Sequence, residues 1–139
     1  MSVEVEIQVP FHDVDMLGVS WHGHYAKYFE IARCALLDSI DYGYIRMQES
    51  GYLWPIIDFQ VRYIAALGYE QKMIVCAQMV EYEYRLKIKY KIIDSVNKQR
   101  IAKGQTIQVA VDCKTQEMCY ASPSILIEKI NGTDNNCIE

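Results

Sequence analysis

The residues best suited to chemistry gather in one short stretch, from Phe11 to Arg33. All 3 histidines of the chain lie there, with two aspartates separated by a single residue: His12, Asp13, Asp15, His22 and His24. A carboxylate is ionised at about pH 7 unless its surroundings perturb it strongly. Such a group can attack a carbonyl carbon or activate a water molecule that does so. The stretch therefore indicates acyl-transfer chemistry, with Asp15 in one of these two roles.

The start of a helix is the second part expected of such a site. From about Gly23 the apolar residues recur at steps of three and four, which is the period of an amphipathic helix. The first N–H groups of a helix have no partner within it, and the helix dipole favours negative charge there. A carbonyl oxygen placed at this end would have its developing charge stabilised. We therefore expect an oxyanion site where this helix begins.

Simpler interpretations of the same residues stay open. An Asp-x-Asp pair before a helix is often turn and capping chemistry, which is the role we assign to Asp13. Histidines such as His22 and His24 are more often packed or exposed than catalytic. The spacing of the histidines matches no standard metal-binding motif. We therefore predict no metal and no cofactor, but the residues alone do not separate catalysis from capping.

The elements before and within this stretch are a strand and two helices. Apolar residues alternate with polar ones from Val3 to Val9, which predicts a strand with one buried face that ends at Pro10. The helical spacing runs from Tyr25 to Ile40 and ends near 41–43, where a glycine can close it. A short second helix is expected over Tyr44–Glu49, stopped by Gly51.

The rest of the chain has the pattern of β-strands. Strands are expected at Leu53–Ala65, Lys72–Tyr82, Tyr84–Asp94, Gln99–Asp112 and Met118–Lys129. Alternation is clear at residues 85–92 and 107–111, and turn residues stand at 94–98 and 112–116. Short links between consecutive strands favour an antiparallel meander. We predict an α+β fold in which one curved antiparallel sheet wraps around a long central helix.

Composition agrees with one globular domain. The chain has 139 residues, of which 51% are hydrophobic and 23% charged, which is enough for a single core. We expect this domain to cover residues 1–130, followed by a flexible polar tail at 131–139. The net charge of −4 gives no general reason to expect nucleic acid as a partner.

Location and assembly follow from further features of the composition. No apolar run reaches the length needed to span a bilayer, and the alternating, charged N-terminus is not a signal peptide; the prediction is a cytoplasmic protein without a membrane partner. The 5 cysteines form no C-x-x-C pair, so reduced thiols are expected. The 11 tyrosines suit half-buried sheet faces or subunit interfaces, and an exposed sheet edge must be covered. A homo-oligomer is therefore expected.

The stretch also resembles the signature of a known family. Residues 13–25, Asp-Val-Asp-Met-Leu-Gly-Val-Ser-Trp-His-Gly-His-Tyr, precede a Tyr-Phe-Glu-x-Ala-Arg run at 28–33. This pattern resembles hotdog-fold acyl-CoA thioesterases of the 4-hydroxybenzoyl-CoA thioesterase branch and its YbgC-like members. Looser similarity lies at 61–64, at 104–112 and at Pro123. The resemblance implies a hotdog fold, which agrees with the helix and sheet expected above.

The resemblance implies hydrolysis of an acyl-CoA to a carboxylic acid and free CoA. The family's catalytic carboxylate falls on Asp15 and its histidine on His22, and main-chain N–H at the helix start, at His22 and Gly23, would polarise the thioester carbonyl. Asp15 as nucleophile and Asp15 as general base both remain open. Subunit-interface active sites and dimers or tetramers are also implied. Candidate substrate-binding residues are Tyr25 and, for the CoA phosphates, Arg85, Lys87 and Lys103.

The sequence departs from the family pattern at two positions. His24 stands where the family often has asparagine, which affects how the acyl group is oriented, and Ala66 stands where the family has proline, which affects a loop. Two alternatives to an acyl-CoA thioesterase are considered. One is a hotdog thioesterase acting on acyl carrier protein, and the other is a non-catalytic acyl-binding hotdog protein.

Overall fold

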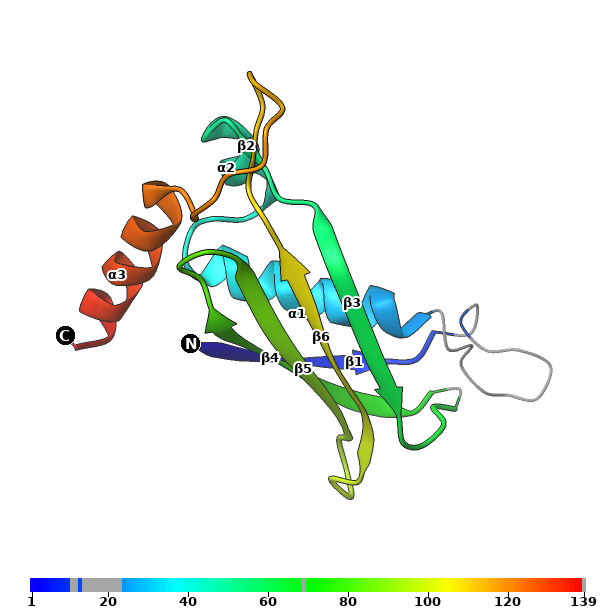
Figure 1. Ribbon diagram of the computed structural model, residues 1–139. Helices are drawn as coiled ribbons and strands as arrows, with labels where there is room; N and C mark the ends of the chain where they lie inside the picture. Colours follow the sequence, from blue (N-terminus) through cyan, green and yellow to red (C-terminus); the bar gives the residue numbers. More distant parts are fainter. Residues whose placement is uncertain (11–12, 14–23, 69, 139) are drawn as a thin grey trace.

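The protein consists of three helices and seven strands within the described part of the chain. A computed structural model describes residues 1–10, 13, 24–68 and 70–138, with side chains up to residue 132. The helices are α1 (Tyr25–Ser39), α2 (Tyr44–Glu49) and α3 (Ser124–Ile138). The strands are β1 (Ser2–Gln8), β2 (Tyr52–Leu53), β3 (Ile56–Tyr63), β4 (Lys72–Glu81), β5 (Leu86–Asp94), β6 (Arg100–Gln108) and β7 (Val111–Asp112) (Figure 1). The two helices predicted before Gly51 are confirmed.

One antiparallel sheet of five strands carries the fold, in the order β1-β4-β5-β6-β3. The meander prediction holds for β4, β5 and β6, but it is wrong for β3. That strand pairs with β6 at the far edge rather than with β4. Residues 64–71 carry the chain from this edge back across the sheet (Figure 1). Alternation reports the face on which a side chain lies and not the neighbour with which a strand pairs, so this error is expected.

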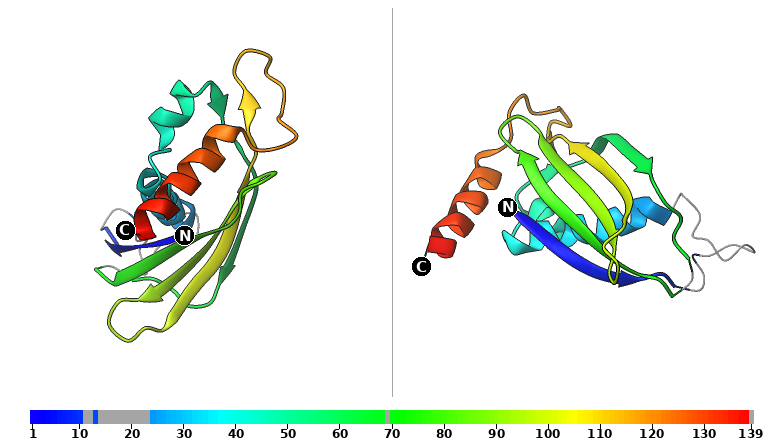
Figure 2. Two further views of the ribbon diagram at one scale, coloured as in Figure 1. Left: turned by 90° about the vertical axis from the view of Figure 1, so that its left-hand side faces the viewer. Right: turned by 90° about the horizontal axis from the view of Figure 1, so that it is seen from below.

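Helix α1 lies across the inner face of the curved sheet, as Figures 1 and 2 show from three sides. Phe29, in the second turn of α1, is fully buried. Its ring stacks on Tyr90 of β5 at 4.6 Å between centroids and lies 6.1 Å from the ring of Phe59 on β3. Gly104 of β6 makes this approach possible, because a Cβ there would stand 2.6 Å from Cε2 of Phe29. The predicted wrapping of a helix by a sheet is confirmed.

Two predicted strands are interrupted. The strand expected at Leu53–Ala65 is split into β2 and β3 at Trp54 and Pro55, and proline has no N–H for a ladder. The strand expected at Gln99–Asp112 is split into β6 and β7. Strands β2 and β7 pair with each other as a small separate sheet beside the main one. These breaks build the wall of a cavity described below.

The prediction of a strand at Met118–Lys129 is wrong over most of that range. Only Met118 makes a β-bridge, and helix α3 begins at Ser124, directly after Pro123. Leu126 and Ile130, four residues apart, are both buried, which is the spacing of one helix face. Helix α3 continues to Ile138, and the flexibility of the tail at 131–139 stays a prediction.

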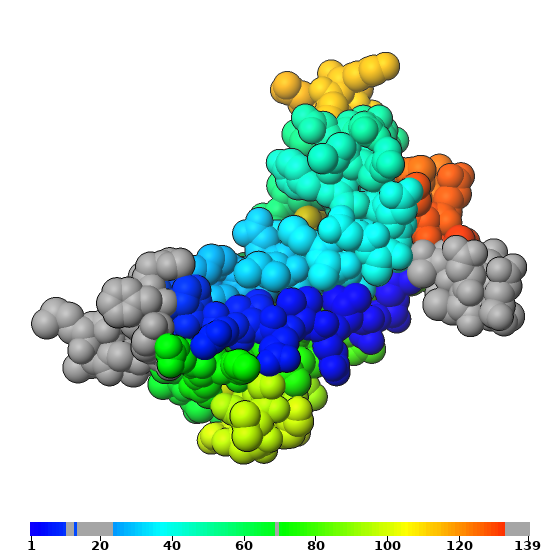
Figure 3. Space-filling model, turned by 180° about the vertical axis from the view of Figure 1, so that it is seen from behind, coloured from blue at the N-terminus to red at the C-terminus, as the bar shows by residue number. Residues whose placement is uncertain are grey.

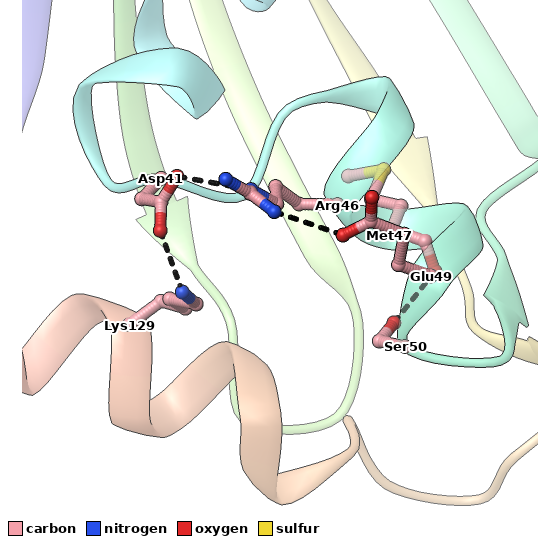
Figure 4. Close-up of polar contacts among 6 residues, drawn as sticks. All are labelled: Asp41, Arg46, Met47, Glu49, Ser50 and Lys129. Atoms are coloured by element: carbon pink, nitrogen blue, oxygen red, sulfur yellow. Dashed lines mark hydrogen bonds and ion pairs between the residues drawn. The ribbon is translucent and has the colours of Figure 1, made fainter.

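A chain of ion pairs ties α3 to the turn between α1 and α2 (Figure 4). Lys129 of α3 contacts Asp41 at 2.8 Å, and Asp41 lies 3.4 Å from Arg46, which in turn pairs with Glu49 at 2.9 Å. Asp41, Arg46 and Glu49 are more than half exposed, so each pair contributes little energy. Burial of Leu126 and Ile130 therefore holds α3 in place, and the ion pairs fix its direction. Among the described helices, none has the length and apolarity to cross a membrane.

Candidate active site

Asp13 is a buried carboxylate at the beginning of α1. It is 1% exposed, and both of its oxygens accept hydrogen bonds from Lys27 Nζ, at 2.5 and 2.6 Å. The hydroxyl of Tyr28 donates to the same carboxylate at 2.8 Å. From the sequence we expected Asp13 only in turn and capping chemistry, and this cluster was not predicted. Lys27, a cation close to the apolar start of the helix, was the signal available in the sequence.

Asp13 is held in its charged form. Burial by itself raises the pKa of this carboxyl group. The hydrogen bonds from Lys27 and Tyr28 and the nearby charges of Lys27 and His24 lower the pKa by more than burial raises it, so the pKa lies below its ordinary value. Nδ1 of His24 lies 3.6 Å from Oδ1 of Asp13. Opposite charges and hydrogen bonds to the ionised form outweigh desolvation here. The result is a charged anchor that fixes residue 13 against the first turns of α1.

The predicted catalytic residues Asp15, His22 and Gly23 lie outside the described residues. Helix α1 begins at Tyr25 with His24 as its N-cap. The side chain of His24 makes no capping hydrogen bond to the backbone N–H groups of the first turn. The first turn contains no acidic side chain. Backbone N–H groups at such a start can bind a negatively charged oxygen. The end of α1 that the described residues present is therefore compatible with an oxyanion site.

Tyr25 lies at this end but serves the packing of the domain. It is 2% exposed, its hydroxyl donates to the carbonyl of Ala65 at 3.3 Å, and its ring lies 4.9 Å from that of Tyr63. Burial raises the pKa of this hydroxyl. Tyr25 thus joins α1 to the end of β3, and its predicted role in binding substrate stays a prediction.

The predicted phosphate-binding residues fall into two groups. Nε of Arg85 lies 3.1 Å from Glu81, so part of its charge is already compensated. Lys87 and Lys103 lie on the outward face of the sheet, the side turned away from α1 and toward the viewer in Figure 1. Lys103 stands directly opposite Lys91 on one side and Arg62 on the other. Lys87 instead stands opposite Glu81 on β4 and Ile107 on β6, four residues along β6 from Lys103, so Arg85 and Lys87 both lie apart from Lys103.

These cations form a basic row, defined as Arg62, Lys103 and Lys91 from three adjacent strands. In the described part of the chain none of the three forms an ion pair within 4.0 Å. The row borders a shallow hollow of about 750 Å³, which also includes Lys89, Glu4 and glutamine side chains. Like charges directly opposite on a sheet destabilise it. An anion bound here would relieve that repulsion.

A second cavity, of about 460 Å³, lies between α1, α2 and the start of β3. In Figure 3 a notch separates the two helices, and yellow atoms from the end of β6 are visible at its floor. Tyr52 and Trp54 line this cavity, whereas Ile57 and Phe59 are exposed on β3. Gln108 also lines it and was not predicted. The cavity is mainly apolar, as small-molecule sites usually are.

The described residues contain no group of three or more histidine, cysteine or acidic side chains that could hold a metal ion. The cluster at α1 offers Asp13 and His24, with a lysine between the carboxylate and solvent. A lysine ammonium donates and cannot ligate a cation.

Comparison with known proteins relates the chain to thioesterases. The family model of the thioesterase-like superfamily matches residues 9–128. YneP of Bacillus subtilis, provisionally named as an acyl-CoA thioesterase, is 29% identical over 77 residues, which are 55% of this chain and 56% of that protein. The chain thus spans little more than half the length of that relative.

Solved structures of thioesterases have a fold similar to that of this chain. A DHNA-CoA thioesterase from Staphylococcus aureus is similar with a TM-score of 0.78 and 26% identity, over 86% of this chain and 80% of that one. A 1,4-dihydroxy-2-naphthoyl-CoA thioesterase from Synechocystis is similar with a TM-score of 0.85 and 18% identity, over 96% and 98% of the two chains. At that identity the second similarity concerns the fold alone, which is the predicted hotdog architecture.

Proposed function

Because this chain belongs to the thioesterase-like superfamily, we propose that it is an acyl-CoA thioesterase. It would hydrolyse the thioester to a carboxylic acid and free CoA. The observation that carries the proposal is the charged anchor at α1, where the buried Asp13 binds Lys27 and Tyr28. An anchored carboxylate two positions before Asp15 restricts the chain at the start of a helix, where a thioester oxygen would be stabilised.

In this proposal Asp15 acts on the thioester carbonyl as nucleophile or general base, as the sequence predicts. His22 and Gly23 would supply N–H groups to the carbonyl oxygen. Consecutive Cα atoms are about 3.8 Å apart, so two peptide units span at most about 7 Å. Fixing residue 13 by its side chain therefore limits the region that Asp15 can reach. The contribution of Asp13 is positional, and no proton transfer is assigned to it.

The basic row is the proposed site for the phosphates of CoA. Arg62, Lys103 and Lys91 are adjacent across three strands and have no ion-pair partner among the described residues. Neighbouring strands lie about 4.8 Å apart, so the row spans about 10 Å between its outer Cα atoms. That width suits a ligand carrying several phosphates. Lys103 keeps its predicted role here, whereas Arg85, paired with Glu81, is less suited to it.

We assign the free edge of β3 as the surface where a second copy binds. Strand β3 has no neighbour on its outer side in the described sheet, and it exposes apolar side chains: Ile57 at 58%, Phe59 at 41% and Tyr63 at 48%. Long apolar edges of this kind pair with another chain. Antiparallel pairing about a two-fold axis would make a dimer with a continuous sheet. A tetramer and a cytoplasmic location remain predictions from the sequence.

A thioesterase that acts on acyl carrier protein is the second candidate. The basic row favours it, because carrier proteins are acidic and would dock on such a face. The row is a local feature, because the net charge of the chain is −4. Hydrolysis rates for one acyl group carried by CoA and by carrier protein separate the two candidates.

Hydrolysis of a panel of short, long and aromatic acyl-CoAs tests the proposed function. We expect turnover by the wild-type protein and a loss of at least about 100-fold in kcat for Asp15→Asn, which keeps the size of the side chain and removes its charge. Asp38→Asn, at an exposed position of α1, is the matched control and should keep full rate. The proposal fails if the wild type hydrolyses no thioester. A fully active Asp15→Asn variant would instead favour another catalytic group.

A further inference from the structure

Two aspartates separated by one residue hinder each other's ionisation. Asp13 and Asp15 are two positions apart, so their Cα atoms lie at most about 7 Å from each other. A negative charge at that range raises the pKa of a second carboxyl group. The proposed reaction requires an ionised Asp15, because only the carboxylate attacks the thioester or accepts a proton from water. The charge of Asp13 must therefore be compensated.

Lys27 supplies this compensation within the charged anchor. Its Nζ donates to both oxygens of Asp13, at 2.5 and 2.6 Å, so the positive charge faces the whole carboxylate rather than one side of it. Asp13 is 1% exposed, and water screens a buried charge much less than an exposed one. An anion and a cation in contact act on a third group as a dipole, whose field falls off faster than that of a single charge. The pair therefore disturbs a neighbouring carboxylate far less than Asp13 would do by itself.

Other titratable groups near the anchor come from several elements. His24, the N-cap of α1, has Nδ1 at 3.6 Å from Oδ1 of Asp13, and the hydroxyl of Tyr28 donates to the same carboxylate at 2.8 Å. Glu70 is exposed, and its backbone N–H donates to the chain just after β1. Tyr63 of β3 packs its neutral ring against the first residue of α1. The lysine is the group that brings a full positive charge into hydrogen-bond contact with Asp13.

We propose that Lys27 is a positioning residue whose charge keeps Asp15 ionised, because it neutralises the buried carboxylate of Asp13 two positions away. This inference rests on the proposed function for the role of Asp15. It goes beyond that function by giving the anchor an electrostatic effect in addition to fixing the chain. Without Lys27, the two carboxylates would titrate as a coupled pair. Two unit charges about 8 Å apart, at an effective dielectric constant of about 20 to 40, shift each other by about one pKa unit.

A ¹³C NMR titration of the Asp15 carboxyl carbon tests the inference without any substrate. Aspartate is labelled at Cγ, and the signal of Asp15 is assigned by its loss in Asp15→Asn. We expect Lys27→Met to raise the titration midpoint of Asp15 by about one pH unit. Lys27→Arg keeps the charge and should stay within about 0.3 unit of the wild type. Asp13→Asn leaves the lysine uncompensated and should lower the midpoint by about half a unit or more.

The double variant Asp13→Asn/Lys27→Met separates the effect of charge from that of packing. It removes both charges of the anchor, so the midpoint of Asp15 should return to within about 0.3 unit of the wild type. Lys129→Met is the matched control, because this lysine also pairs with an aspartate, Asp41 at 2.8 Å, but beyond the other end of α1. It should leave the midpoint unchanged.

Three results would overturn the inference. The first is an unmoved midpoint of Asp15 in folded Lys27→Met; if that variant does not fold, an unmoved midpoint in Asp13→Asn has the same meaning. The second is a double variant whose midpoint is raised as far as that of Lys27→Met, because packing would then cause the shift. The third is a raised midpoint of Asp13 with Asp15 unmoved, because the effect of the lost charge then stays within the anchor.

The pH dependence of hydrolysis gives the functional readout. The acid limb of kcat/KM reports the pKa of the essential base in the free enzyme, and in each variant it should move in the direction of the NMR midpoint. A uniform loss of rate at every pH, with the limb unmoved, overturns the inference and leaves Lys27 a structural role. Hydrolysis with unmoved midpoints leaves the thioesterase standing and overturns the role of Lys27. The expected midpoint shifts in a protein that hydrolyses no thioester support the compensation of charge and overturn the thioesterase.

Discussion

The charged anchor at α1 gives the sharpest prediction for stability. The side chain of Asp13 is fully buried, whereas that of Lys27 is 42% exposed. Breaking a buried ion pair costs about 3–5 kcal/mol, but water screens the exposed part of Lys27. We expect Lys27→Met to lower the free energy of unfolding by about 1–2 kcal/mol and Asp13→Asn by about 2–3 kcal/mol. Asparagine costs less than the full amount because its oxygen still accepts from Tyr28.

Urea unfolding of the wild type, both single variants and the double variant measures this coupling. The double variant should be about 1 kcal/mol more stable than the sum of the single effects predicts, because the second change removes a group already deprived of its partner. The pair Arg46–Glu49, with both side chains more than half exposed, is the control and should couple by less than about 0.5 kcal/mol. A coupling between Asp13 and Lys27 no larger than the control refutes the anchor.

The same anchor predicts a dependence of stability on pH. The pKa of Asp13 is lowered in the folded protein, so its contribution is fully present above the unfolded value of about 3.9. It is lost as the pH falls through the folded pKa, because the unfolded chain then binds the proton more readily. The difference in stability between wild type and Asp13→Asn should therefore shrink below about pH 4. A difference that stays constant from about pH 7 to pH 2 contradicts this account.

Three further changes test the packing, the basic row and the interface. Gly104→Ala should lower the unfolding free energy by about 1–3 kcal/mol, because the added Cβ meets the backbone carbonyl of Gln60 and the ring of Phe29. Gly132→Ala, with open space around it, should be neutral or stabilising in the same urea assay. Lys103→Glu should raise the KM for acyl-CoA about tenfold with little change in kcat, since charge-assisted bonds to phosphate are lost; an unchanged KM would remove the row from the substrate site. Ile57→Lys should shift sedimentation toward the monomer by placing a charge on the free edge of β3, and an unchanged oligomer would place the interface elsewhere.

The local periodicities predicted the elements that lie near the site. The spacing of Tyr25, Tyr28, Phe29, Ala32 and Leu36 predicts α1, and all five side chains are buried. Alternation predicts β1 and β5 for the same reason, since backbone geometry alone sets these periods. The antiparallel sheet around one helix also follows, because an apolar helix stripe requires a sheet to cover it.

Long-range packing decided the elements where local preference was ambiguous. Ile125 and Ile127 are good strand formers, yet α3 forms because Leu126 and Ile130 are buried together. Strand β3 pairs with β6 because residues 64–71 return the chain across the sheet. Neither choice is visible in a short window of sequence, since each depends on partners distant in the chain.

The candidate site also has features that local sequence predicts and features that only long-range packing decides. Residue types and spacing between Phe11 and Arg33 indicated acyl-transfer chemistry and, through resemblance, the family. The tertiary structure decided that Asp13 is a buried, charged anchor, because Lys27 and Tyr28 meet it from α1.

Gln108 shows most clearly what could not be predicted from the sequence. The alternation at 107–111 does not say which set of side chains faces α1. Ile107 and Gln108 are both buried, and Gln108 stands opposite Leu86, on the face toward α1. Strand register determines that face, and a shift by one residue exchanges every side chain between faces. The sequence by itself determined the elements and the kind of chemistry. Only the folded sheet decided which polar side chain lines the cavity, because pairing between distant strands sets the register.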